Sequence, residues 1–522
     1  MNISRRGFCR NALLAGVVSA GISLLGALGA PSCEAQEKNE RPVLLTLLHT
    51  NDLHGHVYLP DETTGLTRIA SMVRRIRQEM PNVLLLDAGD IIHSTPEEKV
   101  FEGKPVISAM NALGYDAATT GNHEFDFGQR INLQARHLAQ FPFLSANVLD
   151  EKTGRPWGGM QPYIVREIEG VRVAIFGLTT TGTVPIEFPR TLQGIRFADP
   201  IETARVLAPR LREQERADVV IALTHLGYKV DQELATVPGI DVILGGHSHT
   251  RLEKQVWVNG TLIQQTGSYA RALGRVDLLI ERDAAGKARL TINGQEGRWW
   301  GRDGVAAPLG KTYPSGPLLD PTAETAHDAA VLAAYLPYRE DMNRRRAEVL
   351  TTALEPLPAE GAKTGATALG ILLAEAVRAK FQADVGAVPS GAIAKGLPVG
   401  TINVGQAWDT IGGYTRQHIV TARVPGVQLR EFVQRALQPG QYAAQVSGLA
   451  QHADRIEING QPLRDDAFYT VAGTAYLIQD QFLGRDGVTI LNDDPEATTT
   501  REAFVEFLRG HKPLQSSRKQ SQ

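Results

Sequence analysis

The stretch TTGNHEFDFG, residues 119–128, places an amide, an imidazole and two carboxylates within five consecutive residues, directly behind a glycine. Polar and charged side chains lose favourable hydration when they are buried, so crowding them together requires partners that replace water. A short apolar segment precedes the stretch, as expected if the stretch is a loop at the end of a β-strand. What these groups hold therefore depends on which other strands end beside them.

Six apolar runs between residues 41 and 282 alternate with amphipathic segments, which is the pattern of a layered α/β domain. The runs are LLTLLHTNDLH, NVLLLDAGD, AATTGNHE, VRVAIFGL, DVVIALTHLG and DVILGGHSH. In five of the six, the apolar residues give way to Asp, Asn or His, usually beside glycine. Ligands of α/β sheets bind beyond the carboxyl ends of the strands, so we expect these polar side chains to gather there.

Seven oxygen or nitrogen ligands stand at these five strand ends: Asp52, His54, Asp90, Asn122, His225, His247 and His249. Asp52 and His54 are two residues apart, and alternate residues of a strand project to the same side, so both can bind one ion. The last two histidines repeat this spacing. Seven ligands exceed what one ion accepts, and we expect two ions that share Asp90 as a bridge.

The alternative for any one of these residues is a turn or a cap, which is the commoner role of a single Asp at a strand end. Their recurrence in order along the domain favours the metal site. Imidazole, carboxylate and amide oxygen without thiolate suit Mn, Fe, Co or Zn better than Ca or Mg. Two such ions, about 3.5 to 4 Å apart, can lower the pKa of a shared water and bind the oxygens of a phosphoryl group. The layout favours hydrolysis of a phosphate ester.

The motifs DLH, GD, GNHEFDFG, THLG and GGHSH resemble those of the calcineurin-like metallophosphoesterases, specifically their exported 5'-nucleotidase and UDP-sugar hydrolase branch. The resemblance extends over nearly the whole chain that follows the leader described below. It implies an α/β protein with an N-terminal four-layer metallophosphoesterase β-sandwich flanked by helices. It also implies a C-terminal α/β domain of the 5'-nucleotidase type, which would bind the substrate.

The resemblance also implies a role for each site residue. One ion would be held by Asp52, His54, Asp90 and His249, and the other by Asp90, Asn122, His225 and His247. His123 would be the catalytic histidine that contacts the phosphate and stabilises or protonates the leaving oxygen, while Asp126 orients it. A histidine held by a carboxylate in this way is positioned and kept basic. Glu124 is left with a supporting role near the metals or at a helix start.

The domain boundaries follow from composition. We expect a signal peptide at 1–35, the phosphoesterase domain at 41–300, a linker and bridging helix at 301–350, and the substrate-binding domain at 351–510. Gly and Pro are frequent in 301–324, as in a linker. The bridging helix contains Pro337, where a kink is expected.

In the C-terminal domain the resemblance implies a nucleoside site in which two aromatic rings stack on the base. The framework segments ATALGILLAEAVR and GRDG are similar to those of the family, but the contact residues depart from it. Relatives read NGGGIR where this chain reads PSGAIA, and LPFGN where it reads IGGYTRQ. Tyr414 and Phe482 are the candidate aromatics, and Asp486 is the candidate loop carboxylate.

The N-terminus begins with a twin-arginine segment, SRRGFCR, followed by an apolar run from 12 to 30. This pattern predicts a Tat export signal that is cleaved near Ala35, and the Tat machinery would be a partner during secretion. An uncleaved membrane anchor is the alternative. A lipid anchor on Cys33 is disfavoured, because the segment APSC lacks the large apolar residue expected three places before a lipidated cysteine. Cys9 and Cys33 both lie in the leader, so the mature chain would carry no thiol.

A net charge of -3 gives no basic surface for a nucleic acid polymer, and we expect no stable membrane partner. The expected function is a two-metal phosphoester hydrolase, with a periplasmic 5'-nucleotidase first among the candidates. Hydrolysis of 2',3'-cyclic nucleotides or of UDP-sugars is the alternative. A sulfur-ester hydrolase and a non-catalytic binding protein that retains metals are further alternatives, and the intact GNHE and the presence of His123 and Asp126 argue against them.

Overall fold

The computed structural model describes residues 41–514 apart from short stretches, and every structural statement below concerns the described residues. The stretches left out are 61, 284, 294–297, 301–305, 309–316, 413–417, 439, 453–454, 495 and 512. The predicted leader and most of the predicted linker therefore lie outside the described residues. Among the helices that are described, none combines the length and the apolar content that crossing a membrane requires.

The first sheet contains three of the six predicted strands. Its parallel strands are β1 (Val43–Thr50), β2 (Val83–Asp87), β3 (Ala117–Thr119) and β4 (Phe143–Leu144). On the other side, β1 pairs with the antiparallel strand β13 (Leu273–Arg282), and β13 in turn pairs antiparallel with β14 (Ala288–Asn293) and β17 (Leu318–Leu319). All eight residues of β1 are buried, so this strand is mostly apolar on both faces rather than alternating.

The second sheet contains the other three predicted strands. Its parallel core is β7 (Val171–Thr179), β9 (Val219–His225), β10 (Val242–Gly245) and β12 (Thr261–Gln264). The antiparallel strands β6 (Tyr163–Ile168) and β11 (Val256–Val258) form its edges. The six predicted strands are thus confirmed, and they divide equally between two sheets.

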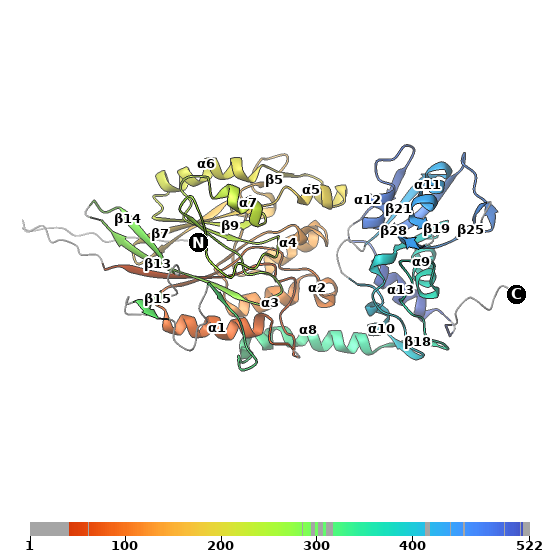
Figure 1. Ribbon diagram of the computed structural model, residues 1–522, viewed down its shortest axis with the longest axis horizontal. Coiled ribbons are helices and arrows are strands. Elements are labelled where there is room, and N and C mark those ends of the chain that lie inside the picture. The colour runs from red at the N-terminus through yellow and green to blue at the C-terminus, as the bar shows by residue number, and fades with distance from the viewer. Residues whose placement is uncertain are drawn as a thin grey trace, which may run out of the picture. The chain divides into compact units, whose positions relative to one another are not determined.

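The two sheets face each other across an apolar core to which Leu45, Leu47 and Leu86 contribute from the first sheet and Ile221 and Leu223 from the second. The outer face of the first sheet is covered by α1 (Leu66–Glu79) and α3 (Lys104–Leu113), and α8 (Ala329–Ala347) packs against both helices. The helices α6 (Pro200–Glu213) and α7 (Tyr228–Leu234) cover the second sheet. Figure 1 shows α6 and α7 on one side of the sandwich and α1 and α3 on the other. This arrangement confirms the four layers.

The helix α1 shows why these segments are helical. Leu66, Ile69, Val73 and Ile76 are fully buried at spacings of three and four residues, so they form one apolar stripe against the sheet. The predicted helix with an internal proline is α8, which contains Pro337.

The C-terminal region is built on a mixed five-stranded sheet. Its strands, in spatial order, are β24 (Ala444–Ser447), β19 (Val385–Pro389), β28 (Phe468–Thr474), β21 (Ile419–Pro425) and β29 (Thr489–Asn492). One core includes α9 (Ala368–Phe381) and α13 (Thr500–Arg509), and the other includes α11 (Gly426–Ala436) and α12 (Ala475–Gln481). The predicted helix ATALGILLAEAVRAKF is α9. Its first turn is capped by Thr367, whose side chain accepts the N–H of Gly370.

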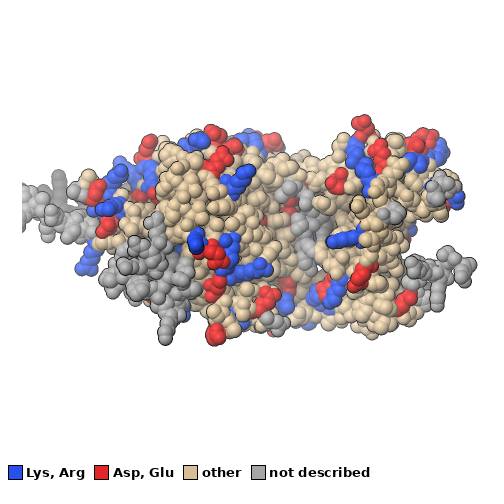
Figure 2. All heavy atoms as spheres, viewed as in Figure 1, with Lys and Arg blue, Asp and Glu red and all other residues tan. Residues whose placement is uncertain are grey.

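The face of the molecule drawn in Figure 2 carries acidic and basic side chains intermixed, without a large field of one sign among the described residues. This distribution agrees with the small net charge of -3.

Candidate active site

The carboxyl ends of the two sheets meet, and all seven predicted ligands lie at or just beyond the ends of β1, β2, β3, β9 and β10. Several hydrogen bonds join the two sheets there, among them the following two. The hydroxyl of Thr179 donates to the carbonyl oxygen of Thr120 over 2.8 Å. His225 Nδ1 lies 2.7 Å from the carbonyl oxygen of Ala88, which accepts its N–H. Side chains from both sheets therefore share one small volume.

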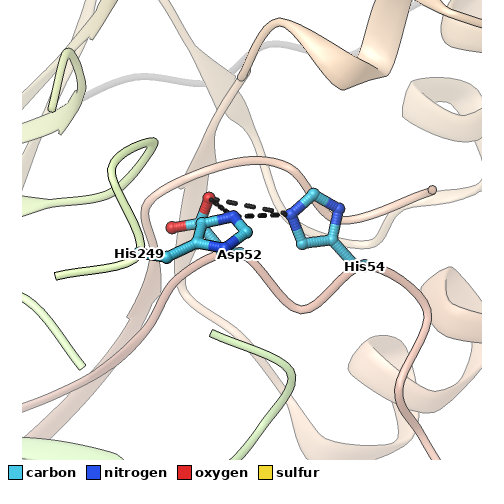
Figure 3. A group of neighbouring side chains, drawn as sticks. All are labelled: Asp52, His54 and His249. Carbon is cyan, nitrogen blue, oxygen red and sulfur yellow. Dashed lines mark hydrogen bonds and ion pairs between the residues drawn. The ribbon is translucent and has the colours of Figure 1, made fainter. Parts of the chain in front are cut away.

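The first ligand group contains Asp52, His54 and His249, and Figure 3 shows that their polar atoms converge although His249 comes from a different sheet. The Nε2 atoms of the two histidines lie 3.1 Å apart. His249 Nε2 is 3.3 Å from Asp52 Oδ1, and His54 Nε2 is 3.8 Å from the same oxygen. Three donor atoms that face one point at these distances form a group that could hold one metal ion.

The second group contains Asp90, His225 and His247. His225 Nε2 lies 3.0 Å from Asp90 Oδ2, and His247 Nδ1 lies 2.8 Å from the amide oxygen of Asn122. Asn122 is therefore beside this group, as predicted. The same Asp90 oxygen is 3.9 Å from His54 Nε2, so it lies between the two groups.

The backbone at the ligands differs from the expectation of strand alternation. Five of the seven ligands have a left-handed backbone, with φ of 52° at Asp52, 47° at His54, 57° at Asp90, 80° at His247 and 52° at His249. They lie in loops beyond the strands, so the loop backbone, and not the strand pleat, directs each pair of side chains. Residues other than glycine rarely adopt this backbone conformation. It persists where the surrounding structure imposes it, often at functional sites.

Glu124 holds two of these loops together. Its carboxylate accepts the backbone N–H of Asp90 over 3.0 Å, that of Ile91 over 2.5 Å and that of Gly121. Gly121 has to be glycine because a Cβ there would lie 2.1 Å from Asp90 Oδ1. The loop that follows β3 thus approaches the loop that follows β2 closely enough to fix the orientation of Asp90.

His123 and Asp126 form the predicted pair, with His123 Nδ1 2.7 Å from Asp126 Oδ2. Both belong to or adjoin the short helix η1 (His123–Phe125), so one helical turn brings them together. The backbone N–H of His123 donates to Asp90 Oδ1 over 2.9 Å, which ties the pair to the ligand groups. Asp126 is buried, with 1% of its side chain exposed, whereas 24% of the His123 side chain is exposed.

One residue of this site, His93, is absent from the sequence prediction. Its Nε2 lies 2.8 Å from the same oxygen of Asp126, and its ring stacks on that of His123. His93 is three residues beyond Asp90 in a loop, outside any regular spacing. The only signal for it was a histidine close to a strand end.

Burial and neighbouring carboxylates shift the pKa values of the histidine ligands in opposite directions. It lowers the pKa of His247 to about 4 and that of His54 well below its usual range, which leaves both imidazoles neutral and able to bind a metal. Burial also acts to lower the pKa of His225, but Asp90, Asp52 and the Ala88 carbonyl together raise it to about 10. The space between His225 and Asp90 thus favours positive charge.

The donor set fits a divalent ion. His225 gives its Nδ1 proton to Ala88, so Nε2 is the nitrogen directed at Asp90, 3.0 Å from its Oδ2. A buried imidazole nitrogen and a carboxylate oxygen that face each other can bind one metal ion together in place of a shared proton. Carboxylate, imidazole and amide oxygen together suit a transition-metal ion.

The three residues predicted to bind the substrate in the C-terminal region do not form a common site among the described residues. Tyr414 lies outside the described residues. Phe482 is 0% exposed and packs on Phe432 with ring centroids 5.1 Å apart, so it offers no face on which a base could stack. This burial corrects the expectation for Phe482, because the apolar core takes up the ring. Asp486 is exposed in the loop between α12 and β29.

The same region contains a cavity of about 380 Å³. Segments 388–392, 411–412 and 474–481 line much of it, and Tyr476 and Asp480 of α12 are among the polar side chains there. Neither residue was predicted, because the sequence alone does not show which face of α12 borders a cavity.

The fold and the site together define the class of the protein, which is a metallophosphoesterase. Residues 45–251 match the calcineurin-like phosphoesterase family, and residues 348–493 match the 5'-nucleotidase C-terminal domain family. The chain therefore carries a calcineurin-like phosphoesterase domain followed by a 5'-nucleotidase C-terminal domain, as the sequence motifs indicated.

Individual relatives agree with this assignment. The chain is 26% identical over 574 residues to a 5'-nucleotidase of Vibrio cholerae, with 97% of both chains covered. It is 30% identical over 436 residues to the trifunctional nucleotide phosphoesterase protein YfkN of Bacillus subtilis, covering 75% of this chain but only 27% of that longer protein. The crystal structure of a 5'-nucleotidase precursor from Thermus thermophilus superimposes with a TM-score of 0.61 at 25% identity, over 91% of this chain and 98% of that one.

Proposed function

We propose that the chain is a two-metal phosphohydrolase that releases phosphate from nucleotides, a 5'-nucleotidase. The observation that carries the proposal is the position of Asp90 Oδ2, which is 3.0 Å from His225 of one ligand group and 3.9 Å from His54 of the other. A carboxylate between two ligand groups is the arrangement that a pair of ions sharing one bridge requires.

In this proposal each ion has four protein ligands. Asp52, His54, Asp90 and His249 would hold the first ion, and Asp90, Asn122, His225 and His247 would hold the second. The candidate metals are Mn, Zn, Co and Fe, because imidazole nitrogens among the ligands suit these ions better than Ca or Mg. When bound, such ions act as Lewis acids toward the phosphoryl oxygens and the attacking water.

His123 is the proposed catalytic residue. Asp126 accepts the Nδ1 proton of His123, which leaves Nε2 as the nitrogen that can meet the substrate. Burial acts to lower the pKa of His123, but Asp126 and Asp90 together raise it to about 10. The imidazole therefore carries a proton at neutral pH and can donate it to the oxygen of the departing alcohol.

The C-terminal region, which we place at 351–510, is proposed to bind the nucleoside. Its cavity is lined mostly by apolar and small side chains, as suits a base, and Tyr476 offers a partly exposed ring. Tyr414 and Asp486 remain candidates for this role. Among the described lining residues there is no Lys or Arg, which favours a substrate whose only phosphate lies at the metals over a UDP-sugar.

We also propose that the chain is exported to the periplasm by the Tat machinery, on the strength of the twin-arginine segment at residues 4–10. Its substrates are then small phosphoesters outside the cytoplasm. The phosphoesterase domain is placed at 41–300, and the bridging helix is part of 301–350.

The first experiment is a substrate panel with the purified protein, with Mn, Co or Zn added and the bound metal measured. AMP, 2',3'-cyclic AMP, UDP-glucose and p-nitrophenyl phosphate separate the 5'-nucleotidase from its alternatives. We expect metal-dependent release of phosphate from AMP. The absence of metal-dependent turnover with every phosphoester would overturn the proposal.

The second experiment tests His123. His123→Ala should lower kcat on AMP by about 10²- to 10⁴-fold, the usual contribution of a general acid, with the metal content unchanged. His137→Ala is a matched control, because His137 is an exposed histidine whose Nδ1 contacts a backbone carbonyl of its own helix. Loss of metal from His123→Ala would mean that His123 is a ligand instead.

A further inference from the structure

We propose that His93 is a positioning residue for His123 and acts through the carboxylate that the two histidines share. The inference rests on the proposed function, since it concerns how His123 is held for proton donation. It adds to the site a residue that lies outside both ligand groups.

A single carboxylate oxygen of Asp126 accepts a hydrogen bond from each of the two histidines. Asp126 Oδ2 is 2.7 Å from His123 Nδ1 and 2.8 Å from His93 Nε2. The other oxygen, Oδ1, is buried and accepts no hydrogen bond among the described residues. The orientation of Asp126 therefore depends on two bonds to Oδ2, and without His93 it would depend on the bond from His123 alone.

The two rings are also in contact. The centroids of His93 and His123 lie 4.3 Å apart with an angle of 17° between the planes, so the rings are stacked. On another side His54 meets His123 edge to face, with centroids 5.3 Å apart. The ring plane of His123 is thus fixed by His93 through packing as well as through Asp126.

Asp126 selects the tautomer of His93, because its carboxylate only accepts hydrogen bonds, and Ser94 complements that tautomer. The Oγ of Ser94 lies 2.6 Å from His93 Nδ1, and a hydroxyl can donate to that nitrogen. A neutral His93 that accepts at Nδ1 carries its proton on Nε2, where it is donated to Asp126. A chain of hydrogen bonds therefore runs from Ser94 through His93 and Asp126 to His123.

Loss of the His93 donor should affect proton delivery more than binding. A misplacement of a catalytic group by about 1 Å can lower the rate roughly 100-fold. A nucleotide needs its departing alkoxide to be protonated, whereas p-nitrophenolate is a good leaving group that departs unprotonated. The loss should consequently be large with AMP and small with p-nitrophenyl phosphate.

Two substitutions separate the donor from the stacking. His93→Phe keeps a ring of similar size against His123 and removes the donor, while His93→Gln keeps an N–H donor near the Nε2 position and removes the ring. We expect His93→Phe to lower kcat on AMP by about 10- to 100-fold, with KM, metal content and turnover of p-nitrophenyl phosphate nearly unchanged. His93→Gln should retain most of the activity on AMP.

Coupling to His123 gives a further test. In a background of His123→Ala, the additional change His93→Phe should have almost no effect, because two residues that act as one unit are not additive. Independent, multiplied losses would contradict a role through His123. His137→Gln serves as the surface control for a histidine replaced by an amide.

Several outcomes would overturn the proposal. One is unchanged turnover of AMP by His93→Phe. Another is an equal loss of turnover by His93→Phe on AMP and on p-nitrophenyl phosphate together with loss of metal, because that result marks a structural role. If His93→Phe does not fold, His93→Gln still decides, since a folded His93→Gln with a tenfold or larger loss on AMP contradicts a donor role. Failure of the wild-type chain to hydrolyse any phosphoester would instead overturn the proposed function.

Discussion

The candidate metal-binding edge of the first domain and the cavity of the C-terminal region differ in the side chains that form them. At the edge, donor atoms from five strand ends converge, and neighbouring donor atoms lie 2.8 to 3.9 Å apart. The cavity, of about 380 Å³, is bounded mainly by small and apolar side chains. Chemistry requires a few specified atoms at fixed points, whereas recognition of a base requires a shape that many sequences can form.

The largest effect should come from removing the metals, which acts on the first region alone. Dialysis against a chelator should reduce turnover of AMP to the background rate, and addition of Mn should restore it, because the ions supply the charge that stabilises the phosphoryl oxygens. Adenosine should still bind to the metal-free protein, as measured by calorimetry. If adenosine binding disappears with the metals, the two regions are not independent.

A smaller but still large effect is expected from Gly121→Ala. The new Cβ would lie 2.1 Å from Asp90 Oδ1 and 2.6 Å from the Asp90 nitrogen, so the proposed bridge has to move. We expect metal affinity to fall by about 10- to 100-fold, with a parallel fall in activity at limiting metal.

Gly365→Ala is the matched control for this change, because a Cβ at Gly365 meets no atom within 4 Å and the residue lies in the C-terminal region. Metal titrations followed by activity compare the two variants. Normal metal affinity in Gly121→Ala would show that the site tolerates movement of Asp90, which would weaken the contrast between a fixed edge and an adaptable cavity.

The contrast also explains what could be predicted from the sequence. The gathering of the candidate ligands could be predicted because residues such as Asp52, Asn122 and His225 each follow or end an apolar run, and parallel strands bring such ends together. The same runs predicted a layered α/β domain, and the resemblance carried by the motifs implied its four layers.

The remaining features depend on long-range packing. His93 lies in a loop without periodicity, and only the folded chain brings it to Asp126. The left-handed backbone at Asp52 and His54 replaces the strand geometry that their spacing suggested. An aromatic residue in an apolar segment is compatible with a core and with a cavity wall, which is why Phe482 was assigned to the site and Tyr476 was not.

The smallest effect should follow from changes in the cavity, and Tyr476→Ala tests it. The Tyr476 side chain is 50% exposed and borders the cavity, so its ring can lie against a base. Loss of one base–aromatic contact of about 1 to 2 kcal/mol should raise KM for AMP roughly five- to thirtyfold. The kcat for AMP and the turnover of p-nitrophenyl phosphate should change little, since neither depends on that contact. Leu491→Ala, on a 53% exposed residue that does not line the cavity, is the control. A fall in kcat on both substrates would show that the cavity takes part in the chemistry, and the separation of roles between the two regions would then be wrong.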